Sequence, residues 1–74
     1  MKPLKSEHMK GTGMKFQLSI VCDNAAFGDT YEEAAEEVSR VLTVVCNKLA
    51  RGVYGSLCLD ANGNWIGDFE LTKE

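Results

Sequence analysis

One amphipathic segment, residues 30–52, constrains this chain most. Apolar residues recur through it at helical spacing, at positions 34, 35, 38, 41, 42, 45 and 49. Thr30 and Glu33 form a T-x-x-E capping box at its start, and basic residues and a glycine suit its end (Lys48, Arg51, Gly52). Residues 41–46 are locally strand-like, but the apolar stripe runs through them unbroken. We therefore predict one helix of about 21 residues.

The flanking segments have the alternating pattern of strands. Residues 14–22 place Met14, Phe16, Leu18, Ile20 and Cys22 on one face. Residues 53–72 predict a hairpin closed by a three-residue loop at 61–63, with Gly63 in the left-handed conformation. In that register Asp60 lies opposite Asn64, Leu59 faces Trp65 and Gly55 faces Phe69.

These elements predict an α+β fold of β-α-β-β order, with one helix packed on a three-stranded mixed sheet in strand order 1-3-2. Alternation along the two hairpin strands directs one set of side chains toward the helix: Val53, Leu57, Leu59, Trp65, Phe69 and Leu71. Phe27 is predicted to plug the end of the core. The opposite face is predicted to be polar with an apolar centre at Val21, Cys58 and Ile66. That face is either solvated or a surface for self-association.

Length and charge narrow the class of protein. The chain has 74 residues, which suits one small domain, and we predict a disordered extension at 1–13 and a single domain at 14–74. The extension holds three lysines and one glutamate, whereas 14–74 holds five basic and ten acidic groups, a net charge of −5. The negative charge of residues 14–74 disfavours nucleic-acid binding and favours a protein partner with a basic surface. Binding of nucleic acid through the lysines of 1–13 is the least favoured hypothesis.

The cellular location of the protein and its chemistry are predicted mainly from sequence patterns that are missing. The sequence has no apolar run of signal-peptide or membrane-spanning length and no C-x-x-C, which favours a cytoplasmic protein with no membrane association. Cys22, Cys46 and Cys58 are predicted to be free thiols buried as small hydrophobic residues. The D-A-N-G-N stretch at 60–64 departs from the calcium-loop pattern. We predict no catalytic residue, metal or cofactor, and hence no enzyme.

The acidic cluster at the start of the predicted helix is the most distinctive surface feature. Asp29 is followed within nine residues by Glu32, Glu33, Glu36 and Glu37. These carboxylates either favour the helix N-terminus and solubility, or dock on a basic patch of a partner. Asp23 and Asn24 are the other candidate partner-binding residues, although the segment 23–27 equally suits a structural role in the strand-to-helix turn.

Two motifs carry a resemblance to a known group of proteins. The sequences F-Q-L-S-I-V-C-D-N-A-A-F at 16–27 and D-A-N-G-N-W-I-G-D-F-E-L at 60–71 resemble short proteins encoded by tailed phages and prophages. The resemblance spans residues 14–72 and implies a small accessory protein in the cytoplasm of a bacterial host. It brings no activity or catalytic residue with it.

Two functions are consistent with these observations. The first is a non-enzymatic phage accessory protein that binds a host protein, as an inhibitor of host defence of the anti-CRISPR kind. The alternative is a structural or self-associating homodimeric module without an inhibitory role.

Overall fold

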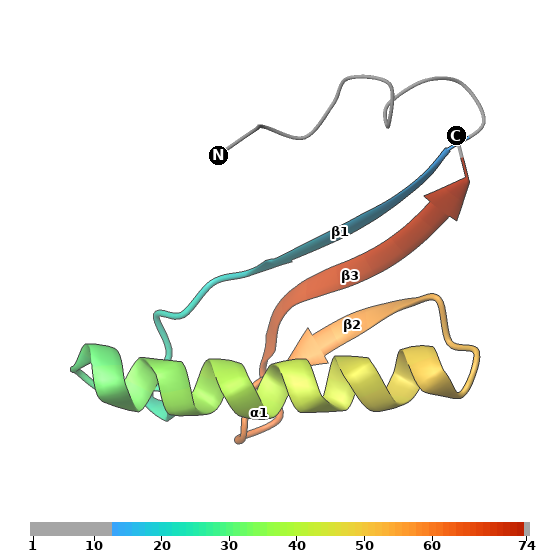
Figure 1. Cartoon of the computed structure of the whole chain (residues 1–74). Coiled ribbons are helices and arrows are strands. Elements are labelled where there is room, and N and C mark those ends of the chain that lie inside the picture. The colour runs from blue at the N-terminus through green and yellow to red at the C-terminus, as the bar shows by residue number, and fades with distance from the viewer. Residues whose placement is uncertain (1–12, 74) are drawn as a thin grey trace.

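The computed structural model describes residues 13–73, and all but one residue of the predicted extension lie outside that range. The elements are β1 (Met14–Ile20), a short 3-10 helix η2 (Ala25–Phe27), α1 (Tyr31–Ala50), β2 (Gly55–Leu59) and β3 (Trp65–Lys73). They form two layers, with α1 lying along one side of the sheet (Figure 1). The α+β class and the order β-α-β-β of the main elements are confirmed.

The sheet has the order β1-β3-β2, as predicted. The last strand is therefore the central one, and it pairs antiparallel with both neighbours. The expectation of a mixed sheet is wrong, because β1 and β2 point the same way but never pair with each other. Every ladder of the sheet is antiparallel.

The predicted helix forms, with both ends as expected. The Glu33 backbone N–H donates to Thr30 Oγ1 at 3.1 Å, and Glu33 Oε1 accepts from the Thr30 N–H at 3.3 Å. This is the complete capping box. Gly52 follows the last turn at φ 87°. Residues 41–46 are helical, so burial of the continuous apolar stripe outweighs their β-branched side chains.

The hairpin turn is also as predicted. The Asp60 N–H donates to the Asn64 carbonyl and the Gly63 N–H donates to the Asp60 carbonyl, both at 2.9 Å. Gly63 has φ 84°, and Leu59 lies opposite Trp65. The three-residue loop is therefore confirmed by its hydrogen bonds and its backbone conformation.

Beyond the turn, a β-bulge changes the register. Cys58 lies opposite Gly67 while Leu59 lies opposite Trp65, so Ile66 is an extra residue on β3. Gly55 consequently pairs with Glu70, and the predicted pairing of Gly55 with Phe69 is wrong. A bulge reverses the alternation on one side of itself, so it also changes which residues face the helix.

The core reflects this reversal. Its buried members are Phe27, Val41, Val45, Cys58, Ile66 and Phe69. Phe27 is fully buried, which confirms the predicted plug. Three residues predicted to face the helix are instead exposed on the other side of the sheet: Leu57, Leu59 and Trp65. Conversely, Cys58 and Ile66 are in the core, so the predicted apolar centre of the outer face is wrong for both.

Candidate functional site

The segments 23–27 and 60–64 meet in space through a side-chain hydrogen bond. Asn24 Nδ2 donates to Asp60 Oδ2 at 2.9 Å, across 36 residues of sequence. Asp60 Oδ1 accepts from the backbone N–H groups of Asn62 and Asn64 at 2.9 and 2.8 Å, and Oδ2 accepts from Asn64 Nδ2 at 3.1 Å. Asp60 thereby holds its own turn closed and ties it to the segment after β1.

These donors lower the pKa of Asp60, and the backbone hydrogen bond from Asn64 is the largest cause. Burial acts in the opposite direction but does not prevail. With four donors on its two oxygens, the carboxylate is a structural acceptor. This explains why a calcium-like sequence forms a turn here.

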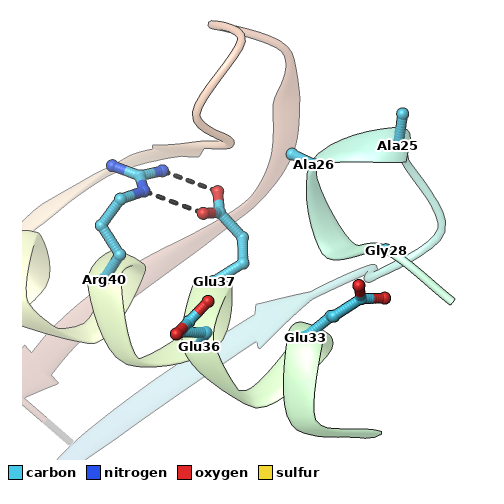
Figure 2. Close-up of a pocket in the computed structure, with 7 residues that line it drawn as sticks. All are labelled: Ala25, Ala26, Gly28, Glu33, Glu36, Glu37 and Arg40. Atoms are coloured by element: carbon cyan, nitrogen blue, oxygen red, sulfur yellow. Dashed lines mark hydrogen bonds and ion pairs between the residues drawn. The ribbon is translucent and has the colours of Figure 1, made fainter. Parts of the chain in front are cut away.

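A second polar contact links α1 to the same turn. Glu37 is buried, and its two oxygens accept from Arg40 Nε at 3.0 Å and Arg40 Nη2 at 2.9 Å, as Figure 2 shows. Glu37 Oε2 also accepts from the Ala61 N–H at 2.8 Å, and Arg40 Nη2 donates to the Leu59 carbonyl at 3.0 Å. The hydrogen bond from Arg40 is the main reason that the pKa of Glu37 is lowered.

An open depression of about 450 Å³ lies between η2 and the first turns of α1. Its lining comprises Ala25, Ala26, Gly28, Glu33, Glu36, Glu37 and Arg40 (Figure 2). Gly28 has φ 67° and ψ −159°, a conformation that is essentially restricted to glycine, and a Cβ there would collide with the Glu33 side chain. The walls of the depression are thus fixed by the fold.

The structure assigns different roles to the six predicted partner-binding residues. Glu37 is buried in the Arg40 pair, whereas Glu33 is exposed and uses one of its two oxygens, Oε1, in the capping box. Asn24 is half-buried and bonded to Asp60. Three others are exposed and take part in neither the capping box nor the Arg40 pair: Asp23, Glu32 and Glu36.

The segment 23–27 has the structural role that the sequence left open. The Asn24 carbonyl accepts from the Phe27 N–H at 2.9 Å, and Phe27 fills the core. Sequence reasoning missed Asp60 and Arg40 in this region. An i,i+3 Glu–Arg pair was readable from the sequence, as was an aspartate two residues before Asn62, but the burial of these groups was not.

The other feature that sequence reasoning missed lies on the face of the sheet away from α1. We call Leu57, Leu59 and Trp65 the outer-face patch. They are 51%, 47% and 67% exposed. Leu59 pairs directly with Trp65, and the Trp65 indole Nε1–H donates to the Gly67 carbonyl at 2.8 Å, which fixes the ring along the strand. Large apolar side chains exposed together are typical of binding surfaces.

The thiols and potential metal ligands of the described residues form no site of their own. Cys58 is buried as predicted, but Cys22 and Cys46 are exposed, which corrects the expectation that all three thiols are buried. Within residues 13–73 no three His, Cys, Asp or Glu side chains are placed to hold a metal ion. The one long helix among these residues is too polar to cross a bilayer.

Comparison with known proteins identified no relative of this chain. No protein-family model, no curated protein and no solved structure matches the chain.

Proposed function

We propose that this chain is a non-enzymatic protein that binds a host protein through the outer-face patch. The observation that carries the proposal is the exposure of Trp65 and two leucines on one face of a small sheet. Tryptophan is among the residues that contribute most to binding energy at protein interfaces. The hydrogen bond from its indole holds the ring in place, which reduces the ordering that binding requires.

The surroundings of the patch indicate the kind of partner. Asp68 lies directly opposite Leu57 on the same face, and Glu70 is two residues further along β3. An apolar centre beside two carboxylates suits a partner surface with an apolar knob and a basic rim. This keeps the predicted basic partner but moves the contact from the acidic cluster to the sheet.

The identity of the host rests on the resemblance of residues 16–27 and 60–71 to tailed-phage proteins. On that basis the partner is a bacterial cytoplasmic protein, and a role in inhibiting host defence is the specific form of the proposal.

A comparison of two double variants tests the surface. The variant Leu57→Gln, Leu59→Gln removes apolar area without adding charge, and Glu32→Gln, Glu36→Gln neutralises two exposed acidic residues of α1 that take no part in the capping box or the Arg40 pair. Each is immobilised beside the parent chain, and bound proteins from a bacterial lysate are quantified by mass spectrometry.

We expect a partner of the parent chain to be lost by the leucine variant and retained by the glutamate variant. The partner's affinity for the leucine variant should fall by at least about tenfold, which corresponds to 1.4 kcal/mol. Loss with the glutamate variant alone would place the docking surface on the acidic cluster and refute the outer-face patch. Equal capture by both variants, or no capture by the parent chain, would also refute it.

A further inference from the structure

The first part of β1 is left open by α1, whereas Leu18 and Ile20 further along the strand pack against the core. A helix is about 10 Å wide and strands lie about 4.8 Å apart, so one helix covers about two strands. Here α1 lies closest to β2, and β1 is on the far side of β3 (Figure 1). Phe16 faces the same side as the core residue Phe69, with ring centroids 6.2 Å apart, yet Phe16 is 46% exposed and Met14 is 67% exposed.

The flank of α1 that looks toward this open part of the sheet is apolar and uncharged. Arg40 and Lys48 mark the opposite flank, because they donate to the Leu59 carbonyl and to Ser56 Oγ on β2. Rotation by about 100° per residue places Leu42 and Cys46 on the side away from them. Leu42 is 46% exposed, and a shallow depression of about 500 Å³ runs along this flank.

The backbone of β1 is also unpaired along its outer edge within the described residues. The Val21 N–H donates to the Ile66 carbonyl, and hydrogen-bonded and non-bonded pairs alternate in an antiparallel ladder. Ser19 and Gln17 therefore exchange hydrogen bonds with β3. The N–H and C=O groups of Ile20, Leu18 and Phe16 point to the free edge.

We propose that two copies of this chain pair through antiparallel β1 strands, which forms a six-stranded sheet with both helices on one face. The inference is independent of the outer-face patch and uses a different surface. The residues with free backbone groups are the same ones whose side chains face the helix layer. Pairing of two β1 edges thus places Phe16 and Leu18 of both copies together on that side.

The dimensions of this assembly fit the side chains. Each helix lies over the β2–β3 half of its own sheet, so the two helix axes are four strand spacings, or about 19 Å, apart. Subtracting one helix diameter leaves a gap of about 9 Å over the paired β1 strands. Phe16, Met14 and Leu42 of both copies border that gap, and their exposed carbons would fill it.

The β2 edge of the sheet is less suited than the β1 edge to pairing between two copies. The carbonyl of Leu59 at the end of β2 already accepts from Arg40. A two-fold axis at this edge would also bring Arg40 and Lys48 of one copy toward the same residues of the other, and like charges repel. At the β1 edge, a two-fold axis joins uncharged side chains on the helix layer.

The available area predicts a weak, reversible dimer. The seven residues of β1 span about 24 Å, and the molecule is 17 Å across in its thinnest direction, so the edge presents on the order of 400 Å² per copy. The total of about 800 Å² is below the range of stable interfaces. A self-complementary edge of this size should associate at high protein concentration and dissociate on dilution.

Residue-resolved amide hydrogen exchange of the full chain tests the proposal without any variant. Exchange at Phe16 and Leu18 should slow as protein concentration rises, because their N–H groups enter the new ladder. Exchange at Gln17 and Ser19 should be slow at every concentration, because β3 already protects them. Fast exchange at Phe16 and Leu18 up to millimolar protein would refute the pairing.

Sedimentation equilibrium of two matched variants provides the second test. Phe16→Lys places a charge in the proposed gap, whereas Gln17→Lys places the same charge on the opposite face, across from Glu70. We expect the first to raise the dimer dissociation constant at least about tenfold and the second to change it by less than about threefold. Leu42→Lys, on the exposed flank of α1, should act like Phe16→Lys without touching the sheet. Self-association that survives both Phe16→Lys and Leu42→Lys, or that is lost in Leu57→Gln instead, would overturn the inference.

Discussion

The β-bulge at Ile66 makes a quantitative prediction that separates two registers of the hairpin. With the bulge, Ile66 is in the core at 6% exposed and Leu57 is half outside it at 51% exposed. Without the bulge, unbroken alternation would place Leu57 inside and Ile66 outside. The substitutions Ile66→Val and Leu57→Val each remove one methylene group and keep a residue suited to strands, so they form a matched pair.

The magnitudes follow from burial. A buried methylene contributes about 0.8 kcal/mol, and the small cavity that remains brings the expected cost of Ile66→Val to about 1 kcal/mol. Because Leu57 is about half exposed, Leu57→Val should lose about half of that transfer free energy, about 0.4 kcal/mol. The β-branched valine suits a strand and offsets part of this loss. Since domains of this size shift by about 4–8 °C in Tm per kcal/mol, Ile66→Val should lower Tm by several degrees and Leu57→Val by about 2 °C or less.

Thermal unfolding followed by circular dichroism measures both values. Urea unfolding followed by the fluorescence of the single tryptophan, Trp65, provides an independent free energy. A small domain of about 60 residues has a total stability of roughly 3–9 kcal/mol, so neither variant should unfold at 25 °C. A larger loss for Leu57→Val than for Ile66→Val would refute the bulged register and the outer-face patch with it.

Three further predictions concern the turn and the thiols. The lowered pKa of Asp60 stabilises the fold above the ordinary aspartate pKa, and this contribution is lost as the pH falls through the lowered value. Asp60→Asn should therefore flatten the decrease in unfolding free energy between about pH 5 and pH 2, measured by urea unfolding at each pH. Gly63→Ala should cost about 1 kcal/mol, because φ is 84° there although no atom lies near a new Cβ; a neutral result in chemical unfolding would contradict that backbone conformation. Burial raises the pKa of the Cys58 thiol, so a thiol reagent should modify Cys22 and Cys46 in the native protein and Cys58 only after unfolding.

Most of the correct predictions from sequence depend on local signals. The capping box, the apolar stripe of α1 and the glycine at position 63 act over a few residues, and each was identified from residue type and spacing. The strand order β1-β3-β2 was also predicted correctly, although no local signal specifies it.

The errors came from interactions between distant residues. The extra residue Ile66 lies where β3 pairs with β2 on one side and accepts the hydrogen bond of Val21 on the other. The neighbouring Gly67 is the local signal that was missed, because a glycine inside a strand often marks a bulge or a close backbone approach, and a Cβ there would collide with the Ser19 carbonyl oxygen. The hydrogen bond between Asn24 and Asp60 crosses 36 residues. Both residues suited turns, but their meeting depends on the assembled fold. The role of Glu37 likewise depends on the assembled fold, because the Ala61 N–H reaches it from the hairpin turn, whereas the capping role of Glu33 was predicted from the local sequence.

The central position of β3 has a consequence for how the chain acquires its structure during synthesis. Both other strands form all their ladder hydrogen bonds with residues of this final strand or its flanks, and Met14 pairs with Lys73. Residues 13–64 can form a helix while they emerge from the ribosome, but they contain no pair of strands that bond to each other. Until residues 65–73 emerge, the β1 and β2 edges stay open, and the nascent chain exposes them to solvent and chaperones.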